Sequence, residues 1–321
     1  MAVRRAVSLV PSATDTAIAL GAGGALVGIS ADCDQPEPAS PRPVVTRPMI
    51  DPAAAADDPA GVDAAVRLQL AAGGLLYELD VDQVVALAPD VVFAQDSCSV
   101  CALPSSEVVA VLSRVGLACD VVSLDPADLE GVLATFPLVG RALGLEGAGM
   151  ELEATCRARL DALGGAGSRA GGSAEADGPR SDGDVSDSHA PRPRVLVLDW
   201  VDPPFVAGNW VPDLVKLAGG EPVLAAAGAP SRQISWEEAS SCQPELVVVA
   251  PCGLDLEAAT PAAVEASEHL GAARVVAFDG RVWFSRPGPR LVEGAEALAA
   301  WLCGAQPTSG VTSIEITEAN R

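Results

Sequence analysis

The chain has 321 residues, and its 43 acidic and 20 basic side chains give a formal net charge of −23 at pH 7. A protein this acidic repels nucleic-acid phosphates and anionic membrane surfaces, so neither is expected as a partner. Hydrophobic residues make up 49% of the chain. This content predicts a globular protein with enough core for one large domain or two medium ones.

The N-terminus, MAVRRAVSLVPSATD, carries two arginines but only a short apolar run before Pro11. A signal peptide needs a longer apolar segment and a small-residue cleavage site. No stretch of about 18 residues is apolar enough throughout to span a membrane. We therefore expect a cytoplasmic protein with reduced cysteines, or an extracytoplasmic one if the start codon has been misassigned.

The first part of the chain alternates short apolar runs with helical patterns. A Pro-, Asp- and Ala-rich loop is expected at 34–61, and the glycines at 21–24 are expected to end the first helix. Strands are expected at 6–10, 25–30, 91–95 and 119–124, and helices at 14–21, 63–72, just before Pro89 and at 105–115. This alternation is typical of a parallel α/β sheet.

Residues 127–163 have apolar side chains at three-to-four spacing, which predicts a long helical stretch. Residues 164–193 contain almost nothing that a core would bury, so a disordered insertion is expected there. A second α/β series follows, with strands expected at 194–200, 274–280 and 281–285 and helices at 210–220 and 288–304. The expected domains are an N-terminal lobe (1–124), a bridging helix (125–163), the insertion (164–193), a C-terminal lobe (194–305) and a loose tail (306–321).

Two segments of the chain have the same predicted order of secondary-structure elements. Residues 80–95 and 235–251 each combine a short helix, a turn with proline and an acidic residue, and a buried strand that leads to a cysteine-bearing loop. Two similar α/β lobes joined by a long helix favour binding of a ligand between the lobes, beyond the carboxyl ends of the strands.

The opening VSLVPSATDTAIALGAGGALVGIS, followed by DCDQP, resembles the cobalamin- and siderophore-binding proteins of ABC importers. The C-terminal lobe resembles them too, in VLDWVDPPFVAGNWVPDLVKLAGGEPVL, SWEEASSCQPELVVVAPCG and VWFSRPGPRLVEGAEALAAWLC. PPFVAG and the pattern WF-x-R-x-x-PR at 283–290 are most similar to the vitamin B12-binding branch. The resemblance implies two α/β lobes joined by a long rigid helix, as in class III periplasmic binding proteins, with the ligand cleft between the lobes.

The resemblance also implies a function: binding of a corrinoid such as cobalamin, or of a metal chelate, in that cleft. The loops after the strands would line it, at 32–36, 95–102, 200–210, 251–254 and 283–286. Flat aromatic walls suit a planar macrocycle, although tryptophans also fill cores. The expected ligand-binding residues are Gln95, Trp200, Phe205, Trp210, Trp283, Phe284 and Arg286. Arg286 and Arg290 either meet an anionic ligand group or cap the last helix and pair with carboxylates.

Importer permeases dock on one acidic residue of each lobe in this family. Glu107 matches the first position, but Ser285 stands near the place where a glutamate is expected for the second. An ABC importer permease is therefore a possible partner that the sequence supports only in part. We expect the protein to be a monomer.

Four cysteines fall in loops that would face the cleft: Cys33, Cys98, Cys101 and Cys252. Thiolates select zinc, iron or an iron–sulfur cluster, so these residues are candidate metal ligands. Three other interpretations stay open: thiols that contact a corrinoid, a Cys98–Cys101 redox pair, and inert side chains. Cys119, Cys156, Cys242 and Cys303 are expected to be buried small hydrophobes.

An alternative function is a cytoplasmic enzyme or cofactor store that reuses this fold with a thiolate-bound metal, a cluster or the redox pair. The chain has only two histidines, and neither lies in a cleft loop. Mechanisms that need a histidine base are therefore not expected, and no catalytic residue is assigned.

Overall fold

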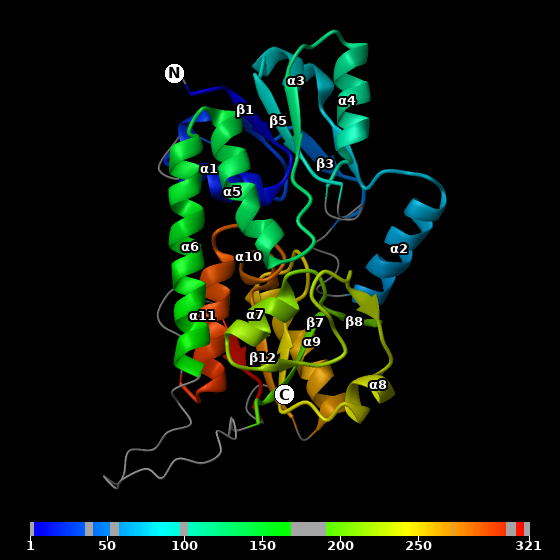
Figure 1. Ribbon diagram of the computed structural model, residues 1–321. Coiled ribbons are helices and arrows are strands. Elements are labelled where there is room, and N and C mark those ends of the chain that lie inside the picture. The colour runs from blue at the N-terminus through cyan, green and yellow to red at the C-terminus, as the bar shows by residue number, and fades with distance from the viewer. Residues whose placement is uncertain are drawn as a thin grey trace, which may run out of the picture.

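The computed structural model describes residues 3–35, 41–51, 58–96, 102–167, 191–271, 273–305 and 313–317. Figure 1 shows two α/β lobes, one above the other, with the long helix α6 (Glu146–Gly167) running beside both. This arrangement confirms the predicted fold class of two α/β lobes joined by a long helix. None of the helices in the described ranges has the length and apolar character that crossing a membrane requires.

The N-terminal lobe is built on a parallel sheet in the order β2-β1-β5-β6. Its strands are β1 (Ala6–Ser8), β2 (Leu26–Ile29), β5 (Val91–Ala94) and β6 (Asp120–Ser123). The residues of β1 and β5 are all buried, as expected for a sheet covered on both faces. The helices and the one 3₁₀ turn are α1 (Pro11–Ala19), η1 (Gly23–Ala25), α2 (Pro59–Ala71), α3 (Val81–Leu87), α4 (Ser105–Arg114) and α5 (Leu129–Leu143).

A small antiparallel pair adds to this lobe. Strands β3 (Thr46–Pro48) and β4 (Tyr77–Leu79) are hydrogen-bonded to each other, and α2 lies between them in the chain. The helix α2 buries none of its 13 residues. Figure 1 shows it as an arm on the side of the molecule opposite α6, reaching down toward the C-terminal lobe.

The C-terminal lobe has a sheet in the order β10-β8-β7-β11-β12-β13, with β9 also paired to β7. The central strands β7 (Arg194–Val201), β11 (Leu246–Val249) and β12 (Arg274–Phe278) are parallel. The others are β8 (Pro204–Val206), β9 (Glu221–Pro222), β10 (Arg232–Gln233) and β13 (Ser313–Glu315). The helices are α7 (Val211–Leu217), α8 (Trp236–Ser241), α9 (Leu256–Leu270), α10 (Gly280–Trp283) and α11 (Leu291–Leu302).

Short polar side chains fix where several helices begin. The carboxylates of Asp80 and Asp128 accept hydrogen bonds from the first turns of α3 and α5. Asp255 and Asp279 do the same for α9 and α10, and the Ser235 hydroxyl does so for α8. Each cap satisfies a backbone N–H that the helix itself leaves without a partner.

The lobes are joined by continuous apolar packing. Leu133 and Phe136 of α5 and Leu160 of α6 belong to the same buried cluster as Trp210, Trp283 and Trp301 of the C-terminal lobe. Helices α5 and α6 therefore contribute to the core of the lobe that follows them. A cluster on the opposite face of the C-terminal sheet is covered by α8 and α9.

Several elements differ from expectation, among them the strand β3 inside the expected loop 34–61. The stretch 125–163 holds two helices, because Gly144 adopts a left-handed conformation (φ 80°) that ends α5 before α6 begins. Residues 281–285 were expected to be a strand, but the Asp279 cap starts the short helix α10 there. Within the expected loose tail, residues 313–315 form the edge strand β13 against β12. Most of the expected insertion, 168–190, lies outside the described residues.

Candidate functional site: the interlobe seam

The two lobes meet where the loop after β2 contacts the turn after α10. We call this contact the interlobe seam and define it by Ser12, Asp15 and residues 32–34 of the N-terminal lobe and residues 283–290 of the C-terminal lobe. Figure 1 places α10 between α1 above and α11 below. A methyl group added at Gly288 would lie 3.6 Å from the backbone of Ser12, so the two lobes approach each other closely here.

Arg286 is the centre of the seam. Its side chain comes from the C-terminal lobe and is only 5% exposed. Its Nη1 donates a 2.6 Å hydrogen bond to Asp34 Oδ2, and its Nη2 donates a 2.7 Å hydrogen bond to the Asp32 carbonyl. One guanidinium therefore holds two acceptors of the opposite lobe, and the bond to the Asp34 carboxylate is charge-assisted.

A second carboxyl group, that of Asp15 in α1, lies near the same guanidinium. Its Oδ2 is 3.8 Å from Arg286 Nη1, and the side chain is buried. Among the described residues, that oxygen has no hydrogen-bond partner. Burial raises the pKa of Asp15 to about 6, although Arg286 and Arg290 act in the opposite direction.

The pKa of Asp34 is shifted in the opposite direction to that of Asp15. Burial raises the pKa of its carboxyl, but the hydrogen bond and the charge of Arg286 outweigh this and hold the pKa below its usual value. Arg290 adds a second cation, with its Nη1 3.9 Å from Asp34 Oδ2. The Arg290 guanidinium also lies 4.6 Å from the centre of the Trp283 ring, a cation–π contact that fixes its position.

Cys33 stands between Asp32 and Asp34 in the sequence, and its thiol is buried. The Thr14 hydroxyl donates a 3.0 Å hydrogen bond to its sulfur, and the Ser30 hydroxyl lies 3.3 Å away. Burial raises the pKa of the Cys33 thiol, so it stays protonated near neutral pH. A protonated buried thiol is a poor metal ligand.

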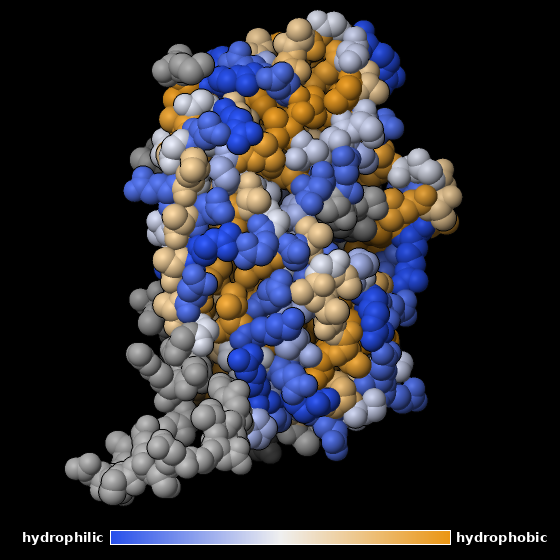
Figure 2. Space-filling model, in the orientation of Figure 1, coloured by the Kyte–Doolittle hydropathy of each residue, from blue (hydrophilic) through white to orange (hydrophobic). Residues whose placement is uncertain are grey.

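A second contact joins the lobes at the outer edge of the molecule. Arg67 of α2 donates a 2.9 Å hydrogen bond to the Gln233 side chain of β10, and its guanidinium lies 6.0 Å from the centre of the Phe205 ring. We call this the rim contact. It is solvent-exposed, unlike the seam. Figure 2 shows apolar surface on the same arm, where Leu68 is 74% exposed.

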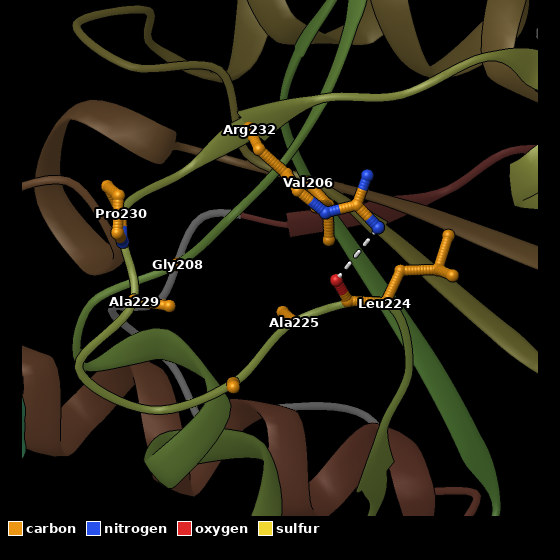
Figure 3. Close-up of a pocket in the computed structure, with 8 residues that line it drawn as sticks. Val206, Gly208, Leu224, Ala225, Ala229, Pro230 and Arg232 are labelled. Carbon is orange, nitrogen blue, oxygen red and sulfur yellow. Dashed lines mark hydrogen bonds between the residues drawn. The ribbon is translucent and has the colours of Figure 1, made fainter.

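The C-terminal lobe has a hollow of about 400 Å³ between β8 and the loop that leads to β10 (Figure 3). Its lining is mostly small and apolar: Val206, Gly208, Leu224, Ala225, Ala226, Ala229, Pro230 and Arg232. Figure 3 shows the Arg232 side chain turned toward the Leu224 carbonyl, to which it donates a hydrogen bond. The same guanidinium pairs with Glu238, so Arg232 is held at the edge of the hollow.

The carboxyl group of Asp199 is linked by hydrogen bonds to the wall of this hollow. The Ser231 hydroxyl donates to Asp199, at the end of β7, and accepts a hydrogen bond from the Gly208 N–H. Burial raises the pKa of Asp199 to about 6. The hydrogen bonds link the loop to the strand end and fix one wall of the hollow.

The predicted aromatic wall divides into two groups. Trp210, Trp283 and Phe284 are buried in the core of the C-terminal lobe, where the Trp210 indole donates to the Phe284 carbonyl. Trp200 and Phe205 lie on β7 and β8 and remain partly exposed. Only this second pair presents ring surface that a ligand reaches without displacing core side chains.

The remaining predicted residues are dispersed. Gln95 is buried at the end of β5, and Glu107 is exposed in the first turn of α4. Cys252 is exposed at the carboxyl end of β11, while Cys98 and Cys101 lie outside the described residues. Within the described ranges, no three histidine, cysteine or carboxylate side chains are placed to share a metal ion. The predicted cysteine site for zinc, iron or a cluster is therefore not shown, and two of its four residues lie outside the described ranges.

Sequence reasoning missed Asp15, Asp34 and the rim contact. Residues 32–36 were expected to line the cleft, and pairing of Arg286 with carboxylates was one of two open interpretations. Asp15 carried no signal, because a single acid in a helix of small residues is most often a solvated side chain.

No protein-family profile and no curated protein matches the chain. Solved structures do. A periplasmic heme-binding protein from Pseudomonas aeruginosa aligns with TM-score 0.63 and 22% identity, over 96% of this chain and 95% of that one. The vitamin B12-binding protein BtuF of Vibrio cholerae aligns with TM-score 0.61 and 18% identity, over 94% and 97%. The heme-binding protein RhuT from Roseiflexus sp. RS-1 gives 0.59 and 19%, over 94% and 98%.

The chain has the fold of the class III periplasmic binding proteins. Identities of 22% and below establish the fold and not the ligand. The neighbours also correct one expectation. All three are described as periplasmic, which contradicts the expected cytoplasmic location.

Proposed function

We propose that this protein is the substrate-binding protein of an ABC-type importer and that it captures a tetrapyrrole-class ligand, a corrinoid such as cobalamin or a heme, between its lobes. The observation that carries the proposal is the two-lobed fold itself. It is shared over nearly the whole chain with proteins described as binding heme or vitamin B12. We propose no catalytic role.

The contact surfaces fit this ligand class. Trp200 and Phe205 are cross-strand partners with partly exposed aromatic surface on the C-terminal lobe, and Arg67 of the opposite lobe lies over the Phe205 ring. A flat macrocycle buries such surface well. Arg290, which is partly exposed, brings a cation to the edge of the seam, where the carboxylate or amide edge of a macrocycle would find hydrogen-bond donors.

The proposal places the protein outside the cytoplasmic membrane, where it would deliver its ligand to a permease. Glu107 is exposed on α4 and is the proposed docking residue of the N-terminal lobe. Ser285 of the C-terminal lobe is half-buried at the end of α10 and offers no charge. Docking to the permease would therefore depend more strongly on Glu107 than on Ser285. Fractionation of cells that express the chain at native level tests the location.

Binding is tested by titrating the purified protein with cyanocobalamin and, separately, with hemin, while following ligand absorbance and tryptophan fluorescence. We expect saturable binding of one of them at one ligand per chain. The double variant Trp200→Ala/Phe205→Ala should weaken it at least tenfold, since about 1.4 kcal/mol of lost contact suffices.

The matched control is Trp236→Ala. Trp236 stacks on His269 with ring centres 4.3 Å apart, on the α8–α9 face of the C-terminal lobe. This variant removes a tryptophan away from the seam and should leave affinity unchanged. Failure of both ligands to bind, or equal loss in both variants, would contradict the proposal.

A further inference from the structure

The seam contains more carboxyl groups than its central guanidinium satisfies. Asp34 takes the close hydrogen bond of Arg286 at 2.6 Å, whereas Asp15 stays at 3.8 Å with one oxygen unbonded among the described residues. Both belong to the N-terminal lobe, and Arg286 belongs to the C-terminal lobe. The ionisation of Asp15 therefore affects a contact between the lobes and not one within a lobe.

The other charged groups near Arg286 come from each element packed around it. The loop after β2 supplies Asp32, Cys33 and Asp34, and α1 supplies Asp15. The start of α11 supplies Arg290 and Glu293, while α10 supplies Arg281 and its cap Asp279. The buried Cys33 thiol stays neutral, and Tyr77 donates a hydrogen bond to the Asp32 carboxyl.

We propose that Asp15, Asp34 and Arg286 form a proton-sensitive latch between the lobes, which tightens when Asp15 takes up a proton. Asp34 keeps the lobes joined at all pH values at which it is ionised. A charged Asp15 is buried beside a guanidinium that already serves another carboxylate, so it weakens the closed arrangement. A neutral Asp15 removes that cost and leaves the Asp34–Arg286 bond intact.

The direction follows from proton linkage. In the closed state the pKa of Asp15 is about 6, and in a state that exposes the side chain to water it returns toward 3.8. The closed state then binds the proton more tightly, so closure strengthens as the pH falls through 6. Between about pH 7.5 and about pH 5, the ratio of closed to open molecules should rise about tenfold.

This latch does not depend on the identity of the ligand. It is tested on the ligand-free protein, so its failure and the failure of the proposed function are distinguishable. The readout is hydrogen exchange at the backbone amides of Ser285, Gly288 and Leu291, which hydrogen-bond inside the C-terminal lobe in and beside the turn that carries Arg286. Protection factors, corrected for the intrinsic pH dependence of exchange, report the opening equilibrium.

We expect protection of these amides to rise about tenfold from about pH 7.5 to about pH 5 in the wild-type chain. In Asp15→Asn, which keeps the shape and is always neutral, protection should be high and independent of pH. The matched control is Asp199→Asn. Its carboxyl has a pKa raised to about 6 by burial, as for Asp15, but it lies within the C-terminal lobe. That variant should keep the pH dependence at the seam.

A pH dependence that persists in Asp15→Asn would overturn the proposal, as would its loss in Asp199→Asn. If Asp15→Asn does not fold, the wild-type chain still decides the question. Seam protection that stays constant or falls between the two pH values contradicts the latch.

Discussion

The seam and the rim contact both join the lobes through an arginine, but they differ in burial. Arg286 is 5% exposed and has three aspartates of the opposite lobe around it. The Arg67 side chain is 53% exposed, pairs with Asp63 on its own helix, and meets one neutral side chain and one ring of the opposite lobe. Breaking a buried ion pair by removing one partner costs about 3–5 kcal/mol. An exposed contact contributes about 0.2–1 kcal/mol.

This difference indicates which side of the molecule opens. The seam lies beside the apolar packing of α5 and α6, so both fix the lobes on the same side. The rim lies on the far side, where α2 buries no residue. We infer that a ligand reaches the space between the lobes past α2, because separating the lobes at the rim is the less costly movement.

The largest expected effect is that of Arg286→Met. It leaves two carboxylates at the seam without their cation, and the free energy of unfolding should fall by about 3–5 kcal/mol. Denaturant unfolding near neutral pH measures it. Arg290→Met is the control, since that side chain is partly exposed and its loss should cost about 1 kcal/mol or less. Equal losses would show that the seam is not centred on Arg286.

A smaller effect on the free energy of unfolding is expected when the Asp34 and Asp15 carboxylates of the seam are replaced one at a time. Asp34→Asn removes the charged acceptor at 2.6 Å and should cost about 1–2 kcal/mol near neutral pH, because the side chain is partly exposed. Asp15→Asn should be neutral or stabilising under the same conditions. Denaturant unfolding of both variants shows which substitution lowers the free energy of unfolding more. If Asp15→Asn were the more damaging one, Asp15 and not Asp34 would hold the lobes together.

The smallest effect on stability is that of Arg67→Ala. Loss of the Gln233 hydrogen bond and of the Phe205 contact should lower the free energy of unfolding by less than about 1 kcal/mol. Ligand association should become faster, since the arm no longer ties the two lobes at the rim. Stopped-flow mixing with the ligand identified by titration measures this. An unchanged or slower association rate would place ligand access elsewhere.

The sequence predicted the buried central strands of both lobes well, since they are short apolar runs between helix caps and turns, but it did not predict β8, β9, β10 or β13. It failed at 281–285, where Val282, Trp283 and Phe284 form a short apolar run between Arg281 and Ser285, as in a buried strand. The cap at Asp279 was the contrary signal, and it decides the structure because the N–H of Val282 bonds its carboxylate. A local pattern of five residues cannot separate these two outcomes.

The candidate site was less predictable. The turn with Arg286 and the loop with Asp34 were each expected near the cleft, but their pairing joins residues 252 positions apart. Trp283 and Trp210 were expected as ligand walls because of their place in predicted cleft loops, yet they are packed in a core with Trp301 and other large side chains. Whether an aromatic ring lines a cleft or a core depends on how helices cover the sheet, and single-sequence patterns do not specify this.

The most direct test of interlobe binding is a hydrogen-exchange footprint of the ligand identified by titration. The account predicts new protection in segments of both lobes, around residues 30–35 and 91–96 of one and 199–210 and 283–290 of the other. Helices α8 and α9, on the far face of the C-terminal lobe, should be unchanged. Protection confined to a single lobe, or to α8 and α9, would contradict binding between the lobes.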